Sequence, residues 1–127
     1  MEHLPLMRGA RIAVETCMAV GPDEEVLIVT DTGKIRIAEA LAYAARSLGA
    51  ETSMIVMLPR ARSGVEPPRA VAEAMLGADV ILMPTTHSLS HTEARRKASE
   101  AGARIASMPG ITEDMMSTGA MTADYEQ

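Results

Sequence analysis

Short apolar runs alternate along this chain with segments whose apolar residues recur every three or four positions. The runs cover residues 26–29, 53–58, 80–83 and, more weakly, 103–106. An unbroken apolar run is typical of a strand buried on both faces, as in a parallel sheet covered by helices. Strands and helices that alternate in this way require right-handed crossover connections. The sequence therefore predicts an α/β fold, a three-layer sandwich with a four-stranded parallel sheet and helices on both faces.

The expected strand order is 2-1-3-4, a common order for sheets wound in both directions. The winding then reverses between the first and third strands, and ligands of such sheets bind at the carboxyl ends of those two strands. The loops at this point, 31–34 and 84–87, are rich in polar side chains. They predict a substrate-binding rim made of Asp31, Thr32, Thr85, Thr86 and His87.

For each rim residue, the alternative to substrate binding is a purely structural role. Asp31 or Thr32 suits the cap of the helix that follows, with Gly33 relieving the turn. The threonine hydroxyls at 85–86 suit the end of their own strand. The turn is not a nucleotide-binding loop, because position 28 is isoleucine where a Walker loop needs glycine, and the chain has no G-x-G-x-x-G.

Local signals predict where the helices lie. An amphipathic segment from about Leu6 to Val20 precedes the first strand, and Pro67-Pro68 presets the first turn of a later helix. The pattern at 90–93 is a capping box, and Thr112 begins a last short helix. The inner stripe of the first segment consists of Ala10, Val14, Cys17 and Met18.

His87 and His91 are four residues apart, the spacing that puts two imidazoles on one face of a helix. No glutamate follows His87 as a zincin motif requires, and zinc in proteins usually has three or four protein ligands. Hydrogen bonding to a substrate or to a neighbouring domain is therefore favoured over a metal site. Arg60 and Arg62, in the loop after the second run, suit either solvated loop charges or a clamp for a carboxylate.

Composition bounds the function. The 127 residues carry a net charge of −5 and are 47% hydrophobic, which indicates one folded domain, 1–127. A pI near 5.1, two Tyr and no Phe or Trp argue against a nucleic-acid surface. The chain shows no membrane span and no signal peptide, so we expect a cytoplasmic protein. Eleven Met residues suggest an adaptable partner surface and predict a homo-oligomer.

Four segments, in order along nearly the whole chain, resemble the amino-terminal part of the aminopeptidase T family. They are VLIVTDTGK at 26–34, EPP at 66–68, PTTHSLSHT at 84–92 and MPGIT at 108–112. The family is similar to leucyl aminopeptidases of the M29 metallopeptidase clan, and related chains include dihydroxypyridine dioxygenases.

The resemblance implies a dimeric, two-domain hydrolase that cleaves amino-terminal residues from peptides with two metal ions, usually zinc or cobalt. In the family the metal ligands come from the carboxyl-terminal catalytic domain, so the resemblance assigns no catalytic residue, metal ligand or cofactor to this chain. That missing domain is the implied partner, and the segment 121–125 resembles the start of the connection toward it. The isolated chain is expected to be inactive. The alternative is a free-standing α/β module that binds a small ligand or a protein without catalysis.

Overall fold

The computed structural model describes residues 4–117. The segment 121–125, expected to lead toward a further domain, lies outside the described residues. Four strands form one parallel sheet in the order β2-β1-β3-β4, which confirms the predicted topology. The strands are β1 (Glu25–Asp31), β2 (Glu51–Met57), β3 (Val80–Thr85) and β4 (Arg104–Pro109).

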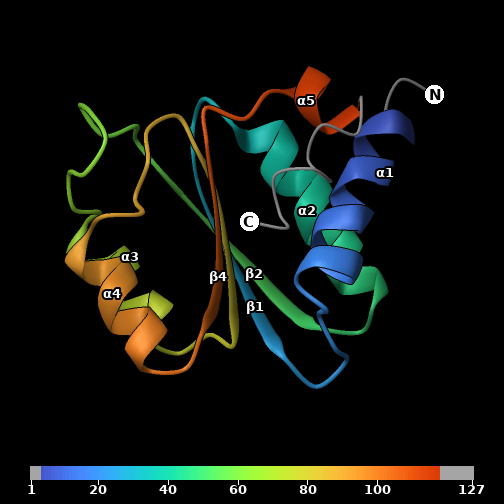
Figure 1. Cartoon of the computed structure of the whole chain (residues 1–127), viewed down its shortest axis with the longest axis horizontal. Helices are drawn as coiled ribbons and strands as arrows, with labels where there is room; N and C mark the ends of the chain where they lie inside the picture. Colours follow the sequence, from blue (N-terminus) through green and yellow to red (C-terminus); the bar gives the residue numbers. More distant parts are fainter. Residues whose placement is uncertain (1–3, 118–127) are drawn as a thin grey trace.

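Helices cover both faces of this sheet (Figure 1). One face carries α1 (Leu4–Arg11), the π-helix η1 (Ile12–Cys17), α2 (Ile35–Ser47) and α5 (Glu113–Ser117). The other face carries α3 (Arg69–Met75) and α4 (Glu93–Glu100). The architecture is therefore the expected three-layer α/β sandwich, with one hydrophobic core on each side of the sheet.

The two central strands supply both cores because successive strand residues point to opposite faces. Val26 and Ile28 of β1 pack toward α1 and α2, whereas Leu27 and Val29 pack toward α3 and α4. All six residues of β3 are buried. Burial of both faces explains why these two strands read as unbroken apolar runs.

The apolar run at 53–58 is not buried on both faces as the sequence predicts. β2 pairs with β1 alone and lies at the edge of the sheet, where Met54 and Val56 remain 36% and 41% exposed. The next residue after the strand, Leu58, is 72% exposed. The interpretation of 53–58 as a strand buried on both faces is therefore wrong, since an apolar run does not distinguish an edge strand from a central one.

The amino-terminal segment is helical, but its inner face differs from the predicted stripe. Within η1 the helix widens, and the Met18 N–H donates to the carbonyl of Ala13, five residues back, at 3.0 Å. The wider turn rotates Ala13 into the core beside Val14 and leaves Cys17 half-buried. The prediction of Cys17 as a core residue assumed a regular 3.6-residue period, which ends at Arg11.

An ion pair joins the start of β4 to the loop before β1. The Arg104 guanidinium donates to both carboxylate oxygens of Glu24, at 2.8 and 2.7 Å, and also to the carbonyl of Met18 at 3.0 Å. The bonds from Arg104, and then the Gly21 N–H, lower the pKa of Glu24 from 4.5 to about 2.

This pair predicts a loss of stability in acid. Because the folded pKa of Glu24 lies below its ordinary value, its contribution is complete above pH 4.5 and is lost as the pH falls toward 2. We expect Glu24→Gln to remove about 1 kcal/mol of this pH dependence, since the pair is partly exposed. Urea unfolding measured across this pH range tests it, with the exposed Glu39→Gln as the control. Parallel pH profiles for Glu24→Gln and the unsubstituted chain would contradict the assignment.

Candidate functional site

The candidate site lies at the carboxyl ends of β1 and β3, where the Asp31 carboxylate joins two loops. Its Oδ2 accepts a hydrogen bond from the Thr86 N–H at 2.6 Å. Its Oδ1 accepts from the Thr86 hydroxyl and from the Gly33 N–H, both at 2.9 Å. Asp31 is only 1% exposed. The carboxylate is thus occupied by donors of the protein itself and fixes the position of both loops.

This network corrects the capping interpretation. Helix α2 begins at Ile35, and neither Asp31 nor Thr32 caps it. Lys34 occupies the N-cap position, and its side chain makes no capping hydrogen bond. The side chain of Asp31 bonds to the turn before the helix instead, because Thr86 holds the carboxylate on the other side.

Thr85 has the structural role that the sequence left open. It is 1% exposed, and its hydroxyl donates to the carbonyl of His87 at 2.7 Å, which closes the end of β3. His87 is half-buried and His91 is exposed. Both precede α4 in a loop, so their four-residue spacing does not put them on one helical face.

The start of α4 is capped from a distance. The predicted capping box at Ser90 is displaced, because Thr92 is the N-cap and its hydroxyl accepts from the Arg95 N–H at 3.2 Å. The Glu66 carboxylate, from the loop after β2, accepts from the N–H groups of Glu93 and Ala94 at 2.6 and 3.2 Å. A carboxylate from another loop thus takes the two donors at the start of this helix.

The loop after β2 is tied to the loop after β3. The Gly64 N–H donates to the carbonyl of Ser88 at 3.0 Å, and the Ser88 N–H donates to the Ser63 hydroxyl at 3.2 Å. Arg60 lies in the same loop, and its Nε is buried without a hydrogen-bond partner among the residues described. Three loops at the carboxyl edge of the sheet are therefore held together as one surface.

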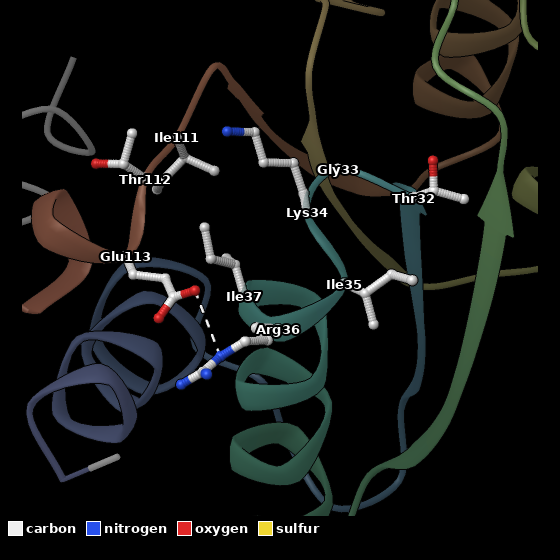
Figure 2. Close-up of a pocket in the computed structure, with 9 residues that line it drawn as sticks. All are labelled: Thr32, Gly33, Lys34, Ile35, Arg36, Ile37, Ile111, Thr112 and Glu113. Atoms are coloured by element: carbon white, nitrogen blue, oxygen red, sulfur yellow. Dashed lines mark ion pairs between the residues drawn. The ribbon is translucent and has the colours of Figure 1, made fainter. Parts of the chain in front are cut away.

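A pocket of about 460 Å³ opens beside this junction (Figure 2). The β1–α2 turn, the first turn of α2 and the connection from β4 to α5 form its walls. In Figure 2 the Lys34 side chain extends toward that connection, and Glu113 points toward Arg36, with 3.3 Å between Arg36 Nε and Glu113 Oε2. The lining residues are Thr32, Gly33, Lys34, Ile35, Arg36, Ile37, Ile111, Thr112 and Glu113.

Of the five predicted rim residues, Thr32 lines the pocket and is exposed. Asp31 and Thr86 form the loop junction beside it, and Gly33 leaves room for their hydrogen bond, because a Cβ there would come within 2.9 Å of the Thr86 hydroxyl. The sequence did not identify Thr112 and Glu113 as wall residues. It predicted that a helix begins there, but no local signal says over which loop that helix folds.

The resemblance places the two metal ions in a further domain and assigns no metal ligand to this chain. Within 4–117, no group of three or more His, Cys, Asp or Glu side chains is arranged to hold a metal ion. Over the same residues, none of the helices is both long and apolar enough to cross a membrane.

Together, the sheet order and the site at its carboxyl edge define a doubly wound parallel α/β protein. No family model and no curated protein matches the chain. The solved structure of a 2,5-dihydroxypyridine dioxygenase from Pseudomonas putida KT2440 is similar, with a TM-score of 0.66 and 16% identity. The match covers 79% of this chain and 32% of the dioxygenase chain, so the matched region spans about a third of that enzyme. At this identity the likeness shows a shared fold alone.

Proposed function

We propose that this chain is the amino-terminal, non-metal-binding domain of an M29-like aminopeptidase that releases amino-terminal residues from peptides. The observation that carries the proposal is the position of the four segments that resemble this family. The segments 26–34, 84–92 and 108–112 each run to the carboxyl edge of the sheet or into the loop beyond it. Segment 66–68 joins them there, because Glu66 binds the first N–H groups of α4.

If another domain completes the substrate site, this domain must contribute a continuous surface to it. The joined loops at the carboxyl edge of the sheet provide such a surface. In the dioxygenase the matched fold likewise occupies about a third of a longer chain, which is a likeness of fold and not of chemistry. In this proposal the metal ions, zinc or cobalt, and the hydrolysis belong to the carboxyl-terminal partner domain. Asp31 and Thr86 position the loops, while Thr32 and His87 face substrate or the partner domain.

The proposal is tested first by the encoding reading frame and by activity. We expect the frame to continue past Gln127 into a segment with clustered Glu, His and Asp. The longer protein should hydrolyse an aminoacyl chromogenic substrate with zinc or cobalt, and the 127-residue chain should not. Calorimetric titration of the short chain with either metal is expected to show no tight binding of two ions. Metal-dependent turnover by the short chain would overturn the assignment.

Substitutions at the rim test the site in the longer enzyme. We expect Thr32→Val and His87→Gln to raise KM or lower kcat by about tenfold, the value of one hydrogen bond, with little change in Tm. Arg69→Gln is the control, since the Arg69 side chain is 91% exposed on the amino-terminal turn of α3. Unchanged kinetics for both rim variants would leave the rim without a role in catalysis or binding.

The pocket beside α2 supports a second candidate, a free-standing small-ligand module without catalysis. Lys34, Thr112 and Glu113 give its walls charged and hydrogen-bonding groups. The two candidate functions differ in whether the reading frame continues past Gln127. A stop codon directly after Gln127, in a protein expressed at that length, favours the binding module over the enzyme domain.

A further inference from the structure

The pocket at the start of α2 is lined by a cation without a counter-charge. Lys34 is half-buried, and its ammonium makes no ion pair and no hydrogen bond with the residues from 4 to 117. In Figure 2 its side chain extends along the pocket toward the connection from β4 to α5. Because charges interact more strongly where the protein displaces water, an anion beside this ammonium is held more firmly than one in open solvent.

The other charges on the pocket wall already match each other. Arg36 Nε lies 3.3 Å from Glu113 Oε2, so these two charges offset one another at the rim. Lys34 then leaves the lining with one positive charge in excess. The backbone acts in the same direction, because no side chain caps α2 and the first N–H groups of a helix carry partial positive charge. The pocket therefore favours a ligand with a negative charge.

The floor of the pocket is apolar. Ile37 and Ile111 line it, and Figure 2 shows their side chains turned toward each other between the Lys34 side chain and the ion pair. The volume of about 460 Å³ lies within the range of about 300–1,000 Å³ that is typical of small-molecule pockets. An anion with a short apolar chain fits this floor, whereas an inorganic ion leaves it uncovered.

The position of the pocket in the fold also suits a ligand. It opens at the carboxyl end of β1, where the winding of the sheet reverses, and open α/β sheets bind their ligands at this point. The adjacent Asp31 carboxylate is occupied by Gly33 and Thr86. These bonds hold the β1–α2 turn in place without using the Lys34 side chain.

We propose that this pocket binds a small organic carboxylate, with the carboxylate on Lys34 and the apolar chain on Ile37 and Ile111. This assignment rests on the proposed small-ligand function and adds the class of ligand to it. A lysine ammonium acts as a point charge with several N–H donors. Recognition at this position therefore depends on the charge of the ligand more than on the geometry of its headgroup.

The test measures equilibrium binding to the 127-residue chain. The probes are 4-methylpentanoate and its neutral amide, 4-methylpentanamide, each titrated while the backbone amide signals are followed by NMR. We expect the carboxylate to shift the signals of residues 32–37 and 111–113, and to bind at least about tenfold more tightly than the amide. Acetate, which lacks the apolar chain, and inorganic phosphate are both expected to bind more weakly than 4-methylpentanoate.

The two lysines of the chain, Lys34 and Lys97, provide a matched pair of variants. Lys34→Met removes the charge and keeps most of the side-chain length, so the dissociation constant of 4-methylpentanoate should rise by at least about tenfold. Lys34→Arg keeps the charge and should retain most of the affinity. Lys97→Met removes an exposed lysine from α4 and should leave the dissociation constant unchanged.

Three results would overturn the proposal. The first is the absence of any shift at residues 32–37 with 4-methylpentanoate. The second is a Lys34→Met chain that keeps its fold and binds the carboxylate as tightly as the unsubstituted chain. The third is an amide that binds as tightly as the carboxylate, which would leave a small-ligand module without an anion site. None of these results depends on whether the reading frame continues past Gln127.

Discussion

Replacement of Asp31 by alanine is expected to lower the free energy of unfolding by about 3 kcal/mol. The carboxylate is 1% exposed and accepts from the Thr86 N–H, the Thr86 hydroxyl and the Gly33 N–H. Its removal leaves three donors without their acceptor at a part-buried junction, where water can reach some of them, so the total stays at about the 1–3 kcal/mol that one unsatisfied buried group costs. Urea unfolding followed by circular dichroism measures the loss.

Two further substitutions sharpen this result. Asp31→Asn keeps the shape but turns one acceptor into a donor, which then faces the N–H of Thr86 or the N–H of Gly33, so we expect a loss nearly as large as for alanine. Glu39→Ala removes an exposed carboxylate from α2 and should change stability by less than about 0.5 kcal/mol. If Asp31→Ala unfolds at the same urea concentration as Glu39→Ala, the carboxylate does not hold the two loops together.

Gly9→Ala should destabilise the fold by about 2–3 kcal/mol, because α1 passes against the backbone of α5 at this residue. A Cβ on Gly9 would lie 2.1 Å from the carbonyl oxygen of Met116 and 2.8 Å from its carbonyl carbon. The same change at an exposed site inside a helix stabilises by about 1 kcal/mol. The expected sign is therefore opposite to that of helix propensity.

Gly77→Ala is the matched control for that prediction. Gly77 follows α3, and its Cβ would find no atom closer than 3.8 Å. We expect its unfolding midpoint to stay the same or to rise slightly. A Gly9→Ala chain as stable as Gly77→Ala would show that α1 and α5 do not pack as closely as described.

The fold was predictable from sequence because its strong signals act locally. The apolar runs at 26–29 and 80–83 are central strands, and the crossover rule leaves few orders for four parallel strands. Thr112 was also identified correctly, since its hydroxyl accepts from the Met115 N–H at 3.1 Å. The burial of 53–58 was predicted wrongly, because it depends on which strands lie on either side of β2 and the run itself does not show this.

The candidate site was also predicted in part. The sheet order correctly indicated that Asp31 and Thr86 meet, but it did not show that their polar groups satisfy each other. Spacing alone favoured a capping box at Ser90, whereas Glu66 supplies the carboxylate from 27 residues away. The turn at Lys34 was recognised, but the opposite wall of its pocket comes from Glu113, which tertiary packing brings there.

The cap that Glu66 provides has a consequence for the order of local opening. The first turn of α4 keeps two of its backbone N–H groups bonded only while the loop after β2 stays in place. That loop is in turn bonded to Ser88 through Ser63 and Gly64. The loop and the helix start therefore form one cooperative unit, whose amide hydrogens exchange together. Cleavage of the chain at the loop would loosen a helix that begins almost thirty residues later.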